Sequence, residues 1–150
     1  MTGKLHQALD ALASVSVTGI NHSYDMSTVP ERLGRASMPI LIALPMMDGG
    51  GLRKHSEAQV FTPSGSNIIV EYYITHLLLY ATPGMYRNVG SSLPGLVDLI
   101  DNYGVAMKAN LKLGGLLYVP LTYYVMPGDI EWGGVPYLGA RFVHRFVIEQ

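Results

Sequence analysis

The most regular pattern in the sequence lies near its C-terminal end: Ala140-Arg141-Phe142-Val143-His144-Arg145-Phe146-Val147-Ile148-Glu149. Every second side chain from Ala140 onward is apolar except His144, while the alternate positions carry two arginines and a glutamate. A period of two is typical of a half-buried β-strand, because successive side chains leave opposite faces of a sheet. The pattern therefore predicts a strand with one face on a core and the other on water or a partner.

Further strands are predicted upstream, each from a run of apolar or alternating residues. They are residues 38–44, residues 55–62, residues 68–80 and a run that ends at Met126. Residues 68–80 are largely apolar on both faces, which predicts a central strand covered on both sides. Pro127-Gly128-Asp129 predicts a turn, and Trp132-Gly133-Gly134 predicts a second break before the final strand.

Two segments have the apolar spacing of helices. Leu5, Ala8, Leu9 and Leu12 form one stripe and predict a helix over residues 4–14. A second helix is expected with Ser92 as its N-cap, Pro94 in its first turn and Gly114-Gly115 beyond its end. Its apolar stripe is expected to consist of Leu93, Leu96, Val97, Ile100 and Met107.

The order of these elements predicts an α+β fold. A mainly antiparallel β-sheet of about four to five strands is expected to pack against two helices. One domain, residues 1–150, is expected at this length. Residues 18–37 show no sustained period and predict a long connection, with a functional role or a partner that holds it in place.

The composition is unusual for a protein that stays monomeric. Hydrophobic residues make up 49% of the chain and charged residues 14%, against roughly 25% charged in typical domains. Eight methionines and ten tyrosines favour contact surfaces. The composition predicts that other subunits cover much of the surface, and a large glycine-rich β core is the alternative.

Several classes of function are disfavoured by what the sequence lacks. The net charge is −1 and no basic run is present, so no direct recognition of nucleic acid is expected. The chain has no cysteine, so disulfides, thiolate metal sites and cysteine nucleophiles are excluded. The longest apolar run, residues 38–47, is far shorter than the roughly 20 residues of a membrane-spanning helix, and no signal peptide or membrane span is expected.

A search for chemistry predicts no catalytic, cofactor or metal site. No two of the five histidines stand three or four residues apart, so no local zinc pair is present. His76 and His144 interrupt apolar strand faces and could meet across the sheet, either as satisfied core or interface histidines or as a pH-sensitive contact. Residues 48–51, Asp-Gly-Gly-Gly, lack the ending of a phosphate-binding loop and predict a flexible hairpin tip.

Three segments together resemble a family of virus proteins. They are Leu93-Pro94-Gly95-Leu96-Val97-Asp98-Leu99-Ile100-Asp101, then Leu113-Gly114-Gly115, and Trp132-Gly133-Gly134-Val135-Pro136-Tyr137-Leu138-Gly139-Ala140-Arg141-Phe142. Their loose patterns of glycine and apolar residues resemble the small neck proteins of long-tailed bacteriophages. The nearest type is the tail terminator, or tail completion protein, and the resemblance extends over residues 38–149 in element order.

The resemblance implies a structural protein of the virion, without enzymatic activity or cofactor. Such a subunit assembles in the host cytoplasm into a homo-hexameric ring at the head-tail junction. The ring caps the tail tube, stops its polymerisation and joins it to the head connector. The implied partners are further copies of the chain, the tail tube protein and a head-closure or connector protein, with no membrane.

Ten residues are expected at subunit or partner interfaces: Met46, Met47, Asp48, Arg53, Met85, Tyr86, Arg87, Trp132, Arg141 and Arg145. Trp132 has a second interpretation as a core residue or the lid of a hairpin. One alternative function is another neck component, namely a head-closure protein, stopper or tube subunit. A different alternative is a ligand-binding α+β enzyme domain with His76, His144 and Tyr124 around a pocket.

Overall fold

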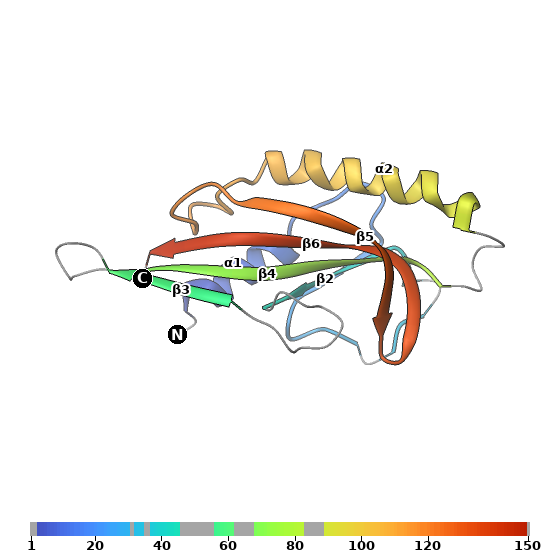
Figure 1. Ribbon diagram of the computed structural model, residues 1–150, viewed down its shortest axis with the longest axis horizontal. Coiled ribbons are helices and arrows are strands. Elements are labelled where there is room, and N and C mark those ends of the chain that lie inside the picture. The colour runs from blue at the N-terminus through green and yellow to red at the C-terminus, as the bar shows by residue number, and fades with distance from the viewer. Residues whose placement is uncertain are drawn as a thin grey trace.

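Two helices cover one face of a six-stranded β-sheet in the computed structural model (Figure 1). The structure describes residues 3–30, 32–34, 37–45, 56–61, 68–82 and 89–149. Within them the elements are α1 (Lys4–Ala13), β1 (His22–Tyr24), β2 (Ile40–Leu44), β3 (Ser56–Phe61), β4 (Ile68–Ala81), α2 (Val89–Lys108), β5 (Thr122–Trp132) and β6 (Val135–Glu149). The predicted α+β class with a mainly antiparallel sheet is confirmed.

The sheet is built around two long central strands, β4 and β6. The strand order is β1-β2-β4-β6-β5, and β3 pairs with β4 beyond the end of β2. All pairs are antiparallel except β1 with β2. Ile74 of β4 lies opposite His144 of β6 in the register. The even-numbered residues of β6, among them His144, therefore share a face of the sheet with the even-numbered residues of β4.

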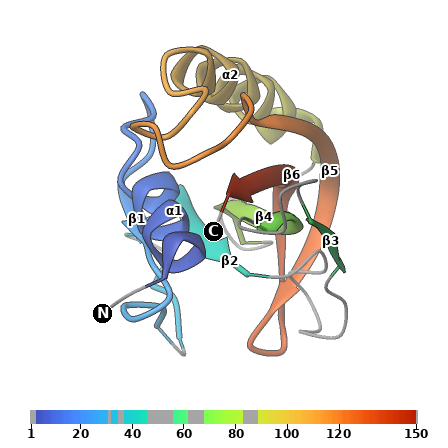
Figure 2. The ribbon, with the colours of Figure 1, turned by 90° about the vertical axis from the view of Figure 1, so that its left-hand side faces the viewer.

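The first core lies between the helices and the sheet. It contains Leu9 and Leu12 of α1, Tyr103 of α2, and Phe142 and Phe146 of β6, all of them buried. In Figure 2, α2 lies above β6 and α1 lies to the left of β4. The predicted alternation of the final strand is thereby confirmed, since the face that carries His144 is the one that meets the helices.

The first helix agrees with its prediction, whereas the second does not begin or end where predicted. α2 starts at Val89, so Ser92 is a buried residue inside the helix and not its N-cap. It ends at Lys108, before the turns that contain Gly114 and Gly115. The buried stripe is Leu96, Leu99, Tyr103 and Met107, and the predicted stripe residues Leu93 and Val97 are exposed.

The predicted turn at residues 127–129 is wrong, because β5 continues through it as a bent strand. Gly128 lies opposite Gly139 in the register. A Cβ on Gly139 would lie 1.9 Å from the carbonyl oxygen of Leu78, so only glycine allows the strands to approach there. Pro127 is tolerated because β5 is an edge strand and needs no outward N–H. The chain reverses later, at Gly133-Gly134, where both φ angles are positive, and the predicted second break is confirmed.

The bent ends of β5 and β6 cover part of the second face of the sheet (Figure 1). Ile130 and Tyr137 pack there against residues of β2 and β4, among them Ile42 and Leu77. Both faces of β4 are therefore buried along part of its length, as its two apolar faces predicted.

The connection at residues 18–37 contains a strand that the sequence did not predict. β1 has three residues, too few to show a period, and pairs in parallel with β2. After it, the Asp25 carboxylate accepts hydrogen bonds from the backbone N–H groups of Ser27 and Thr28 at 2.8 and 3.0 Å, which fixes a tight turn. Val29 and Leu33 then pack on the second core, so the described part of the connection covers the sheet.

None of the helices in the described ranges has the length and apolar character needed to cross a membrane.

Candidate interaction surface

Three polar side chains meet inside the first core. The Tyr103 hydroxyl oxygen of α2 lies 2.8 Å from Nδ1 of His76 on β4 and 2.5 Å from Nε2 of His144 on β6. All three residues are buried, and Phe142 stacks on the Tyr103 ring with 3.6 Å between ring centroids. The predicted meeting of His76 and His144 is confirmed, with 6.4 Å between their ring centroids.

Both imidazoles are neutral in this environment. Burial lowers the pKa of His76 to about 3, and burial together with the nearby His76 lowers the pKa of His144 well below its usual value. Burial also raises the pKa of Tyr103, so its hydroxyl keeps its proton. A hydroxyl with one hydrogen donates to one imidazole and accepts from the N–H of the other. Within the described part of the chain, His76 Nε2 and His144 Nδ1 find no partner.

This cluster is a core contact and not the ligand pocket considered above. His76 and His144 have no exposed surface. Tyr124 lies opposite Val143 in the register and so leaves the other face of the sheet, whereas Tyr123 is the tyrosine beside His144. The pocket of His76, His144 and Tyr124 is therefore wrong. Tyr103 was missed, although its spacing of four residues from both Leu99 and Met107 is a usable signal.

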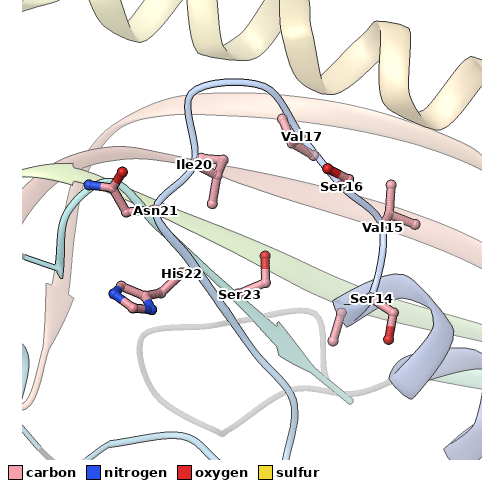
Figure 3. A pocket seen from close by; sticks show the side chains of 9 residues that line it. Ser14, Val15, Ser16, Val17, Ile20, Asn21, His22 and Ser23 are labelled. Atoms are coloured by element: carbon pink, nitrogen blue, oxygen red, sulfur yellow. The ribbon is translucent and has the colours of Figure 1, made fainter.

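A surface pocket of about 250 Å³ lies where the chain passes from α1 to β1 (Figure 3). Its polar side chains include Ser14, Asn21, His22 and Ser23. The Ser14 hydroxyl donates to the carbonyl of Asp10, and the Asn21 amide donates to the carbonyl of Met38. The His22 ring and the Ser23 hydroxyl point in different directions in Figure 3, as neighbours on a strand do, so they form no nucleophile and base pair.

Tyr124 and Met126 lie on the outer face of β5, which is the face that points away from the helices, and both are exposed. Tyr124 is 50% and Met126 43% exposed. Beside them is a groove of about 170 Å³ lined by Tyr73 of β4, Thr122, Tyr123 and Tyr124 of β5, and Val143 and Arg145 of β6. Large apolar side chains beside a groove are typical of contact surfaces.

An ion pair borders this groove. Arg145 Nε donates to Glu71 Oε1 at 2.9 Å, and the Tyr73 hydroxyl donates to the same oxygen at 2.5 Å. Hydrogen bonds from Arg145 and then Tyr73 lower the pKa of Glu71. Arg145, predicted at an interface, is thus held within its own chain and half exposed.

The structure locates three of the ten predicted interface residues. Besides Arg145, Arg141 is partly buried on β6, opposite Leu77 of β4 and Met126 of β5. Trp132 ends β5 and packs on the second core, which agrees with the interpretation as a hairpin lid. The other seven lie outside the described residues: Met46, Met47, Asp48, Arg53, Met85, Tyr86 and Arg87.

The outward side of α2 is also partly apolar. Leu93, Val97 and Val105 are exposed, and Val105 is 71% exposed. They are separated by four and eight residues, so they lie on one side of the helix. The apolar spacing predicted Leu93 and Val97 in the core, because α2 has two neighbouring apolar stripes and only one of them is buried.

Among the described residues, no three His, Asp or Glu side chains lie together in a way that could hold a metal ion. No protein-family model matches the chain, and no curated protein matches it in sequence.

Proposed function

We propose that this chain is a structural subunit of the neck of a long-tailed bacteriophage, a tail terminator that forms a ring on the end of the tail tube. The observation that carries the proposal is the edge of the sheet at β5, where no further described strand pairs, residues 122–126 are uncharged, and Tyr124 and Met126 are exposed. A surface of this kind in water favours association. The resemblance of residues 93–101, 113–115 and 132–142 to neck proteins supports the biological setting.

The mechanism is steric. Subunits bury apolar surface on one another, and the closed ring blocks addition of further tube subunits. Two separate exposed surfaces support a ring that also binds a partner. The edge and outer face of β5 contact neighbouring copies, and the exposed stripe of α2 contacts a second partner in the neck. No bond is made or broken in this mechanism.

An amber mutation in the phage gene tests the proposal. Without a terminator, tubes continue to grow, so electron micrographs of infected cells should show tails longer than normal and detached from heads. Complementation with the wild-type gene should restore normal length. Virions of normal appearance under non-permissive conditions would overturn the proposal.

Another neck component is the second candidate, because the same exposed surfaces suit a head-closure protein. The amber mutant separates the two. Loss of a head-closure protein leaves tails of normal length that do not join heads, whereas loss of a terminator changes tail length.

A further inference from the structure

Among the described strands, β5 forms one edge of the sheet. It is the last strand in the order β1-β2-β4-β6-β5, and no described strand lies on its outer side. Proteins protect such edges with charged residues, proline or very short strands. Residues 122–126 have none of these protections, and Pro127, which lacks an N–H, ends the free segment. This segment is a template for one further strand.

The sheet has a second open edge on its opposite side. β3 (Ser56–Phe61) pairs with β4, and on its other side no described strand pairs with it. β1 also lies toward that side but has only three residues. β3 has six residues, close in length to the free segment of β5 at residues 122–126.

We propose that copies of this chain join head to tail, with β5 of one copy adding to β3 of the next. The inference rests on the proposed ring and names how its subunits join. β3 and β6 both run antiparallel to β4, and β5 runs antiparallel to β6. β5 and β3 therefore run in opposite directions, and neighbouring copies in the same orientation pair them as antiparallel strands. Such a heterologous contact generates a ring when its rotation closes.

The stagger of the two edges is consistent with closure. Gln59, near the centre of β3, lies opposite Val70 of β4. Tyr124, at the centre of the free segment of β5, lies opposite Val143 of β6, which in turn lies opposite Thr75 of β4. The two centres are therefore offset by about five residues of β4, from Val70 to Thr75. If β5 of one copy pairs with β3 of the next at these centres, each copy is displaced by roughly 17 Å along the strand direction. The four strands β3, β4, β6 and β5 together span about 19 Å across the sheet. A displacement of roughly 17 Å over this width corresponds to strands tilted by about 42° from the ring axis, within the roughly 35–45° of closed barrels.

The groove beside β5 gives this contact specificity. Tyr73, Tyr124 and Val143 line it on the face of the sheet away from the helices. A strand added to β5 places every second side chain over that face, while its backbone pairs with the edge. Arg145 remains satisfied by Glu71 at the border of the groove, so the added strand needs no charge there.

The absence of cysteine makes the test direct. Tyr124→Cys is combined with a cysteine at Ala58, Gln59 or Val60, which together sample both faces of β3. Purified variants are treated with copper phenanthroline and run on non-reducing gels, next to each single-cysteine variant. At least one double variant should give a ladder of linked chains that ends at the ring size, and no single variant should go beyond a faint dimer.

Native mass spectrometry of the same proteins separates the two proposals. A ring with no ladder from any double variant overturns the β5–β3 contact and leaves the ring proposal standing. A strong dimer from Tyr124→Cys alone shows that β5 pairs with β5, which also overturns the inference. A monomer in every sample overturns both.

Discussion

The Tyr103 hydroxyl oxygen lies 2.5 Å from Nε2 of His144 and so joins α2 to the last strand inside the core. The same oxygen contacts Nδ1 of His76 at 2.8 Å. One hydroxyl therefore bonds to one ring nitrogen of each of two histidines that have no access to water, whereas His76 Nε2 and His144 Nδ1 have no partner among the described residues. This shared contact offsets part of the cost of burying His76 and His144 on an otherwise apolar face.

Tyr103→Phe should lower the stability of the fold. The change keeps the ring and its stacking on Phe142 but leaves two buried imidazole nitrogens without partners. We expect a loss of about 1–3 kcal/mol in the free energy of unfolding, measured by urea titration. Tyr118→Phe, at an exposed tyrosine, is the matched control and should change it by less than about 0.5 kcal/mol. Equal stability of the two variants would contradict the role given to Tyr103.

Stability should fall as the pH drops below about 6.5. The folded protein holds His76 and His144 neutral, with pKa values lowered by burial, while the unfolded chain binds protons near pH 6.5. The contribution is complete above that pH and declines below it, by up to about 1.4 kcal/mol per pH unit for each histidine. For His76 the decline continues toward its folded pKa of about 3.

Urea titrations between pH 7 and about 5 measure this decline before the carboxylates of the unfolded chain begin to titrate. The double variant His76→Gln, His144→Gln should have a flatter dependence on pH, whatever its stability at pH 7. A slope identical to that of the wild type would show that other groups cause the decline.

Gly139→Ala should be the most damaging small change in the sheet. Its Cβ would lie 1.9 Å from the backbone oxygen of Leu78, and a backbone atom cannot move aside as a flexible side chain can. We expect a loss of about 3 kcal/mol or more, seen as a lower Tm. Gly3→Ala is the control, since no atom lies within 4 Å of its added Cβ. A normal Tm for Gly139→Ala would contradict the close approach of β4 and β6 there.

A lysine on the open edge should weaken assembly. Met126→Lys places a charge on the exposed face of β5, where a neighbouring strand must pack. We expect self-association to weaken by about tenfold or more, equal to about 1.4 kcal/mol, in sedimentation velocity. Val105→Lys changes an equally apolar but separate surface on α2 and should leave the oligomer intact. The reverse result would place the subunit contact on α2.

Much of the fold was predictable because its long strands have regular patterns. The alternation around His144 identified β6, and the two apolar faces of residues 68–80 identified β4 as central. β1 was not predictable, because three residues have no period and depend on pairing with β2. The bend at Gly128 was mistaken for a turn, because proline and glycine have the same local preferences in both and only the tertiary contact with Gly139 distinguishes them.

The candidate surface was harder to predict than the fold. The composition predicted covered surface, but it could not tell which apolar residues of α2 face outward. Leu93 and Val97 have helical spacing with the core residues, and only the packing of α2 on the sheet decides that they are exposed. Met126 was treated as the end of a strand next to a turn, so its place on an open edge could not be recognised.

Native mass spectrometry of the purified wild-type chain, over a series of concentrations, shows whether copies of the chain close into a ring. We expect a closed oligomer of one defined size, six copies by the resemblance to neck proteins, whose mass does not grow with concentration. A monomer throughout the series would contradict it, as would a chain of copies that lengthens without limit.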